Sequence, residues 1–220
     1  MKLYNLIRND EKIKTYINKA DESLKLIGYT EHSFAHITKV AEVSSFILKT
    51  LGYDDKTIEI VKIAAYLHDI GNLINRIEHA QSGAIMAFKI LTDLNVDADV
   101  IADVVTAIGN HDEGTANTLN PISAALILGD KSDVRRSRVR NQNNPDGFDI
   151  HDRVNYSVEK AIVEINEEKT NIILKLDIDT KYCAVMEYFE IFLERMILCR
   201  KAASVLNLTF NLIINGQQIL

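Results

Sequence analysis

Apolar residues recur every three or four positions through most of the first 140 residues, which is the spacing of one helical face. The expected helices are 10–26, from 30 or 33 to 51, 54–69, 78–94, 97–111 and 121–130. Ser33 or Thr30 can cap the second of these helices, and Asp54 or Asp55 can cap the third. We therefore expect a mainly helical N-terminal part.

After position 153 the pattern changes from helical to alternating. An extended strand is expected over 154–158 and 161–165, its partner over 172–178 and a last strand over 209–214, which together make a three-stranded sheet. Thr180 can cap a long helix that ends near position 206. The predicted fold class is therefore α+β, with a mainly α-helical core, a small C-terminal antiparallel sheet and one long helix.

These patterns divide the chain into a helical domain over 1–140, a loop or lid over 141–153 and a C-terminal annex over 154–220. The loop is expected because its polar sequence contains Pro145 and Gly147. The long helix of the annex has a wide apolar stripe. That stripe predicts packing on the sheet, and its surplus width is compatible with a homodimer contact.

Composition narrows the class of protein. A chain of 220 residues, of which 47% are hydrophobic, can bury a full core. No stretch is long and apolar enough for a membrane span, and the first residues lack the apolar region of a signal peptide. We therefore expect a cytoplasmic protein without membrane contact. The net charge of −6 argues against a stable nucleic-acid complex, which favours a basic surface.

Several predicted helices carry a polar residue on their apolar face. His36, His68, His79, His111 and Asp130 each lie at helical spacing from apolar residues. A single buried histidine is more often a core residue than a ligand. Burying all of these groups without partners would cost several kcal/mol each, whereas shared cations would satisfy them together. The sequence therefore predicts a metal site.

The same residues carry a resemblance to a known family. Their local sequences are His36-x-x-Lys39-Val40-Ala41, Leu67-His68-Asp69-Ile70-Gly71, His79-Ala80-Gln81-Ser82-Gly83-Ala84, Gly109-Asn110-His111 and Ala125-x-x-Leu128-Gly129-Asp130-Lys131. This ordered series, over about residues 30–140, resembles the HD superfamily of metal-dependent phosphohydrolases. The nearest pattern is the bacterial branch that includes the symmetrical diadenosine tetraphosphate hydrolases.

The resemblance implies a set of ligands and a chemistry. It implies one metal held by His36, His68, Asp69 and Asp130, and a second metal held by Asp69, His79 and His111. Imidazole and carboxylate suit iron, manganese or zinc, so we expect one or two divalent transition metals as the cofactor. Asp69 would bridge both metals as a catalytic residue, and a metal-activated water would attack the phosphoryl group.

A basic stretch follows Asp130 at once. An arbitrary run of this kind is usually a solvated charged face. Beside a metal centre, however, Lys131, Arg135 and Arg138 are candidate ligands of substrate phosphate. Lys131 is also a candidate catalytic residue, because its charge could stabilise negative charge that develops during the reaction.

Two acidic residues each leave two interpretations open, and two other residues differ from the family pattern. Asp112 and Glu113, beside His111, could orient metal ligands or transfer protons, or could equally be surface acids. Ser33 stands where many relatives have an arginine three residues before the first histidine. Asn72 stands where the HD phosphodiesterases with an added Gly-Tyr-Pro signature carry lysine. The last difference disfavours cyclic-di-GMP as the substrate.

The function expected from these observations is a metal-dependent phosphohydrolase that acts on a small phosphorylated molecule, such as a nucleotide. Three alternatives remain. The first is a nucleotide-binding sensor of the same fold that has no turnover. The second is a di-iron enzyme that uses oxygen, and the third is a structural or partner-binding protein whose histidines belong to the core.

Overall fold

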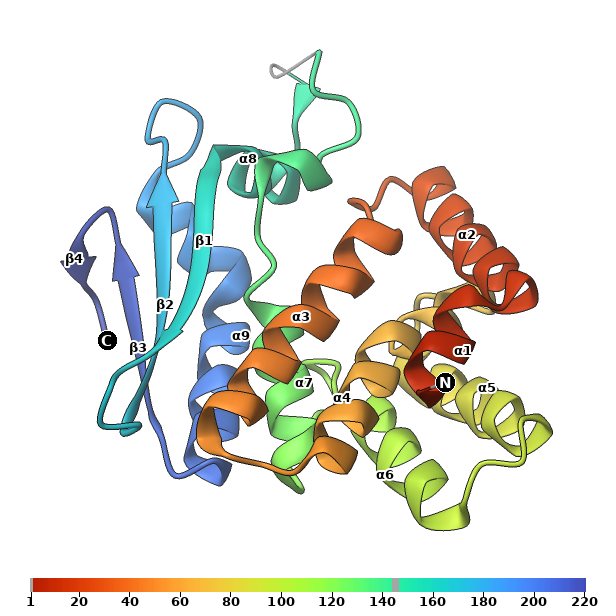
Figure 1. Cartoon of the computed structure of the whole chain (residues 1–220). Helices are drawn as coiled ribbons and strands as arrows, with labels where there is room; N and C mark the ends of the chain where they lie inside the picture. Colours follow the sequence, from red (N-terminus) through yellow and green to blue (C-terminus); the bar gives the residue numbers. More distant parts are fainter. Residues whose placement is uncertain (1, 144–146) are drawn as a thin grey trace.

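The structure is a computed structural model that describes residues 2–143 and 147–220. Helices dominate the first part of the chain, and the strands lie near its C-terminal end (Figure 1). The α-helices are α1 (Leu3–Asn9), α2 (Glu11–Leu26), α3 (Phe34–Leu51), α4 (Asp55–Leu67), α5 (His79–Asp93), α6 (Ala98–Gly109), α7 (Pro121–Lys131), α8 (Ile150–Ser157) and α9 (Val185–Val205). The short 3₁₀ helices are η1 (Ile70–Leu73) and η2 (Arg136–Arg138), and the strands are β1 (Val158–Ile165), β2 (Asn171–Ile178), β3 (Thr209–Ile214) and β4 (Gln217–Gln218). The predicted α+β fold class is confirmed.

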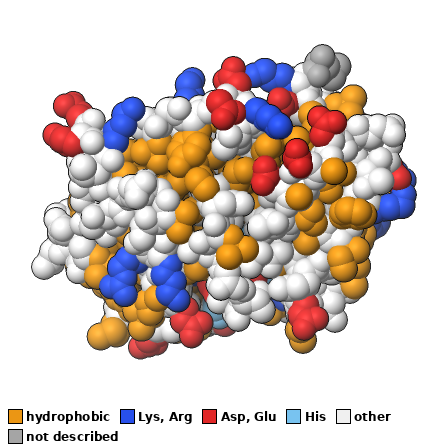
Figure 2. Space-filling view, turned by 90° about the horizontal axis from the view of Figure 1, so that it is seen from below, with side chains coloured by type: hydrophobic (Ala, Val, Ile, Leu, Met, Phe, Trp, Pro, Cys, Tyr) orange, Lys and Arg blue, Asp and Glu red, His pale blue; other side chains and the backbone are white. Residues whose placement is uncertain are grey.

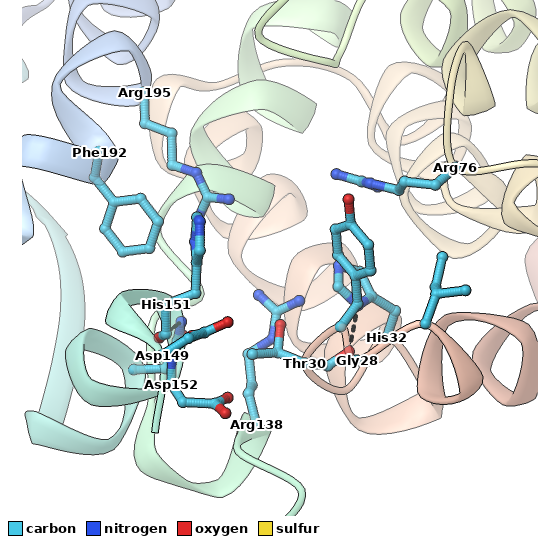
Figure 3. Close-up of a pocket in the computed structure, with 13 residues that line it drawn as sticks. Gly28, Thr30, His32, Arg76, Arg138, Asp149, His151, Asp152, Phe192 and Arg195 are labelled. Atoms are coloured by element: carbon cyan, nitrogen blue, oxygen red, sulfur yellow. Dashed lines mark hydrogen bonds between the residues drawn. The ribbon is translucent and has the colours of Figure 1, made fainter. Parts of the chain in front are cut away.

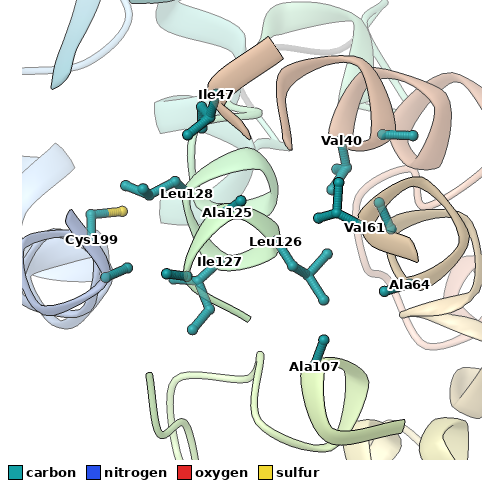
Figure 4. Packing of buried hydrophobic residues seen from close by; sticks show 14 of the residues in the cluster. Val40, Ile47, Val61, Ala64, Ala107, Ala125, Leu126, Ile127, Leu128 and Cys199 are labelled. Carbon is teal, nitrogen blue, oxygen red and sulfur yellow. The ribbon is translucent and has the colours of Figure 1, made fainter. Parts of the chain in front are cut away.

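Helix α7 lies at the centre of the core. All of its residues from Ile122 to Lys131 are buried, because α3, α4, α6 and α9 surround it (Figure 4). A helix that is apolar on all sides is the sequence pattern of such a buried position. Asn120 caps its first turn by accepting a hydrogen bond from Ser123 N. This packing carries Asp130, near the end of α7, into the interior.

Side-chain caps decide where two of the expected helices begin. Ser33 accepts a hydrogen bond from Ala35 N, and Asp54 accepts one from Thr57 N. These two residues, rather than Thr30 and Asp55, are therefore the N-caps of α3 and α4. Capping fixes the first turn of α3, where His36 lies.

Two glycines allow η1 and α5 to touch. A Cβ on Gly71 would lie 2.0 Å from the carbonyl oxygen of His79, and one on Gly83 would lie 3.1 Å from that of His68. The missing side chains of these glycines thus allow backbone to approach backbone. The close approach carries His79 towards the segment that contains His68.

The C-terminal sheet has the order β1-β2-β3-β4 and is mixed. The expectation of an antiparallel sheet is wrong for one pair of strands, since β2 and β3 are parallel. The reason is that α9 connects them and returns the chain to the end of the sheet at which β2 begins, so that β3 runs in the same direction as β2. Alternate residues of β2 and β3 are buried on one face. Helix α9 contacts both α7 and β3, so it joins the sheet to the helical core (Figure 1).

Two local predictions differ from the structure, and a third falls partly outside the described residues. The strand expected over 154–158 is wrong up to Ser157, because these residues complete α8, whose N-cap is Asp149. Val154 and Val158 are spaced equally well for one helical face and for alternation, so the short pattern was ambiguous. The long helix begins at Val185, five residues after Thr180. The loop expected over 141–153 includes residues 144–146, which lie outside the described residues.

The surface alternates apolar patches with charged side chains, as Figure 2 shows for one face. Exposed apolar residues of α9 include Met186, Leu193 and Ile197. The homodimer through this annex stays a prediction. Within residues 2–143 and 147–220, no helix combines the length and the apolar character that a membrane crossing requires.

Candidate metal centre

Six buried side chains converge where several helices meet. They lie near the start of α3, just after α4, at the start of α5, just after α6 and near the end of α7. The six are His36, His68, Asp69, His79, His111 and Asp130, and each is at most 9% exposed. The structure thus brings together all the residues that the sequence predicted as metal ligands.

Asp69 lies between two sets of histidines. Its Oδ2 lies 3.2 Å from His68 Nε2 and 3.4 Å from His36 Nε2. Its Oδ1 lies 3.5 Å from His79 Nε2 and 4.0 Å from His111 Nε2. The two oxygens therefore face different groups, which is the arrangement that a bridging carboxylate requires.

The first group of ligand atoms has the spacing of a metal site. His36 Nε2 lies 3.3 Å from His68 Nε2 and 3.3 Å from Asp130 Oδ1, and His68 Nε2 lies 3.7 Å from the same oxygen. Ligands at about 2.0–2.2 Å from one ion are separated by about 2.8–3.6 Å in octahedral or tetrahedral arrangements. His68, Asp69 and His111 also offer atoms that lie within 4.8 Å of one another.

The other ring nitrogen of each histidine has an acceptor. The Nδ1 atom of His36 lies 2.8 Å from Asp133 Oδ2. The Nδ1 atoms of His68, His79 and His111 lie 2.6–3.1 Å from backbone carbonyl oxygens. When each Nδ1–H donates to its acceptor, each Nε2 presents a lone pair to the centre of the cluster. His79 Nε2 and His111 Nε2 are only 3.2 Å apart, so these facing lone pairs fit a shared cation.

Burial and neighbouring charges shift the pKa values of this cluster. Burial lowers the pKa of His36 and His68, but the adjacent carboxylates outweigh it and raise these values to about 9 and about 10. Burial raises the pKa of Asp69, yet His68 and His36 hold it well below its usual range. Burial also lowers the pKa of His111. The carboxylates therefore favour positive charge at the position of His36 and His68.

Lys131 is buried between two carboxylates. Its Nζ lies 2.7 Å from Asp130 Oδ2 and 3.1 Å from Glu113 Oε2. Burial lowers the pKa of Lys131, but Asp130 and Glu113 raise it above its usual value, so the ammonium group keeps its charge. Glu113 Oε1 also accepts a 2.6 Å hydrogen bond from Arg195 Nε on α9. Glu113 therefore links the metal centre to the C-terminal helix.

A cavity of about 300 Å³ lies beside the cluster, where α8, α9, η2 and the segment after α2 meet (Figure 3). Arg138 lines this cavity, as a phosphate ligand would. Arg135 lies elsewhere. Its Nη2 is 3.0 Å from Glu31 Oε2, and it lines a separate cavity beside α3 and β1. Among the three basic candidates, Arg138 alone therefore combines burial with a place in the cavity wall.

Several residues of the site escaped the sequence analysis. Asp133, the partner of His36, comes three residues after Asp130, and that spacing alone could have suggested it. Arg76, which lines the cavity, lies with its Nη2 3.9 Å from Asp112 Oδ1. The packing of α9 brings Arg195 to the site, and no local sequence pattern predicts that packing.

Comparisons with known proteins give one family match and two similar proteins. The HD domain family model matches residues 33–146, which contain all six residues of the cluster. An uncharacterized protein of Methanocaldococcus jannaschii is 24% identical over 189 residues, covering 76% of this chain and 73% of that protein. The crystal structure of a predicted HD superfamily hydrolase from an uncultured Thermotogales bacterium has 26% identity and a TM-score of 0.44, over 61% of this chain and 75% of that chain. The family model covers more than half of the chain, and the chain therefore belongs to the HD domain family.

Proposed function

We propose that this protein is a metal-dependent phosphohydrolase that cleaves a phosphate ester or anhydride of a nucleotide or small phosphorylated metabolite. The observation that carries the proposal is the position of Asp69. Its two oxygens face two histidine groups inside a buried cluster of an HD domain. That arrangement is suited to two adjacent metal ions.

The side chains divide into two ligand sets that share Asp69. The first set is His36, His68, Asp69 and Asp130, and the second is Asp69, His79 and His111. Iron, manganese and zinc match this mixture of imidazole and carboxylate. Such ions lower the pKa of bound water towards neutrality and neutralise phosphoryl charge.

The protein's own residues orient and charge the site. Asp133 and three backbone carbonyls hold the imidazole rings in fixed orientations. The Lys131 ammonium group, fixed by Asp130 and Glu113, places positive charge beside the reacting phosphoryl group. Arg138 binds phosphate from the cavity side.

The size of the cavity favours a small substrate. About 300 Å³ is at the lower end of the range for ligand pockets. A nucleoside monophosphate or a sugar phosphate suits this space better than a macromolecule. The proposed substrates are therefore small, and diadenosine tetraphosphate is the extended member of the panel below.

The test is phosphate release from a panel of nucleotides, sugar phosphates and diadenosine tetraphosphate by protein supplied with iron, manganese or zinc. We expect turnover of at least one compound, and its loss together with metal retention in Asp69→Ala. Asp177→Ala, at an exposed position of β2, is the matched control and should remain active. Tight nucleotide binding without product would instead indicate a sensor, and oxygen consumption would indicate a di-iron oxygenase.

A further inference from the structure

We propose that the cavity beside the metal centre is a subsite for a second phosphate group of the substrate, formed by Arg76, Arg138 and Arg195. The proposal rests on the proposed function, because it assigns the first phosphate to the metal centre. None of the six cluster residues is among the described residues that line this cavity. The cavity is therefore suited to a part of the substrate away from the reacting phosphorus atom.

The three arginines enter the cavity from different parts of the chain. Arg76 precedes α5, Arg138 belongs to η2 and Arg195 belongs to α9. In Figure 3 their guanidinium groups lie around the middle of the view, with Arg195 at the upper left, Arg76 at the upper right and Arg138 below them. Guanidinium groups that face one space repel each other, and an anion bound between them would relieve this repulsion.

Two of the arginines contact aromatic rings, and one of these two also donates to a carboxylate. Arg195 Nε donates to Glu113, and its guanidinium carbon lies 4.2 Å from the centre of the Phe192 ring. Arg76 lies 5.4 Å from the centre of the Tyr29 ring. These contacts orient the guanidinium groups through cation–π and charged interactions. The arginines are therefore positioned before any ligand binds, which lowers the entropic cost of binding.

Arg138 is held by backbone oxygens. Its Nε donates to Glu31 O and its Nη1 donates to Asp133 O, at 3.0 and 2.8 Å, and the residue is only 4% exposed. Within the described parts of the chain, Arg138 Nη2 and both Nη atoms of Arg195 donate no hydrogen bond. A buried guanidinium group with donors left over is suited to bind an anion.

Phosphate fits this arrangement better than carboxylate does. A phosphate group has oxygens in three directions, whereas a carboxylate is planar and typically pairs with one or two arginines. The same cavity is also lined by Asp149 and Asp152 on the α8 side. These acids would repel a further anion, so the part of the substrate against α8 is neutral or carries hydrogen-bond donors. The substrate class is thus a small organic molecule with two phosphate groups.

The test uses ligands that cannot be hydrolysed. Propylphosphonate carries one phosphonate, phosphonopropionate carries a phosphonate and a carboxylate, and propylene bisphosphonate carries two phosphonates. Calorimetry with the metal-loaded protein should give at least about tenfold tighter binding for the bisphosphonate than for propylphosphonate. Phosphonopropionate should lie between them.

Arg195→Gln should reduce this preference to about twofold or less, with metal content unchanged. Arg76→Gln should reduce it likewise, and its metal content is measured alongside because Arg76 Nη1 lies 3.2 Å from His79 Nε2. Arg200→Gln removes the same charge at an exposed position of α9 and should keep the preference. Thermal melting identifies a variant that fails to fold. Arg76 belongs to a different segment and its side chain is 24% exposed, so its variant serves if Arg195→Gln is unstable.

Three outcomes would overturn the subsite. They are equal binding of the one- and two-phosphonate ligands, an equal loss of affinity for both in the arginine variants, and phosphonopropionate binding as tightly as the bisphosphonate. Because these ligands are not cleaved, a bisphosphonate preference in a protein without turnover would leave the subsite standing and reject the phosphohydrolase. Turnover of monophosphates without this preference would do the reverse.

Discussion

His36 and Asp133 form a buried pair in which Nδ1 of the imidazole donates to Oδ2 of the carboxylate over 2.8 Å. This hydrogen bond fixes the ring so that Nε2 faces Asp69 and Asp130. Asp133 also accepts a hydrogen bond from Arg135 Nε, which holds the carboxylate in place. Arg135 was expected to contact phosphate. In the structure it instead contacts Asp133, which in turn orients His36.

Asp133→Asn should weaken metal binding by about tenfold or more, because a neutral amide oxygen accepts the Nδ1–H of His36 less strongly than a carboxylate does. Competition with a chelator measures this affinity, and Asp177→Asn provides an exposed control. An unchanged affinity in Asp133→Asn, with the fold intact, would show that Asp133 does not orient a ligand.

Gly71→Ala should destabilise the protein by about 1–3 kcal/mol or more, because the new methyl group would collide with the backbone of α5. Metal retention should fall with it, since this contact positions His79. Gly109→Ala is the matched control, because its methyl group would meet only Ala84 Cβ at 3.7 Å. Urea unfolding compares the two variants. Equal stabilities would contradict the close packing of η1 and α5.

The metal-free protein should lose stability as the pH rises from about 7 to about 10. In the folded chain the pKa of His36 is about 9 and that of His68 about 10, both above the ordinary value of 6.5. Such groups contribute stability that is fully present below about pH 6.5 and disappears as the pH passes the folded-state values.

Urea unfolding of the metal-free and metal-loaded forms across this pH range measures the effect. The metal-loaded form should lose less stability, because its ligating imidazoles are already deprotonated. The same pH dependence in both forms would contradict the raised pKa values of His36 and His68.

Arg138→Gln should raise KM for the phosphorylated substrate with metal content preserved, because Arg138 lines the cavity. Arg135→Gln should change KM much less, since Arg135 pairs with Glu31 and Asp133 instead. Steady-state kinetics on both variants measures the difference. Equal increases in KM would mean that the two arginines share one role.

Much of the helical core could be predicted from sequence because its information is local. Repeating apolar faces and the caps at Ser33 and Asp54 define helices, and the polar residues that end these faces converge in the structure. The connection of β2 to β3 through a helix also favours a parallel pair, so the sequence carries a signal for that pairing too.

The remaining parts depend on contacts between distant segments. Arg195 lies 82 positions from Glu113, and their hydrogen bond follows from the packing of α9 on α7. The cavity likewise combines Arg76, Arg138 and Arg195, whose sequence spacing has no period. Charged side chains that meet only through tertiary packing leave no repeating pattern for a sequence to reveal.

The most direct measurement is the number of transition-metal ions per chain, by elemental analysis of protein purified without chelator and with oxygen excluded. The two ligand sets that share Asp69 predict about two ions in the wild type, about one in the His79→Ala/His111→Ala double variant and none in Asp69→Ala. No stoichiometric metal in the wild type, even after iron, manganese and zinc are supplied, would contradict the account.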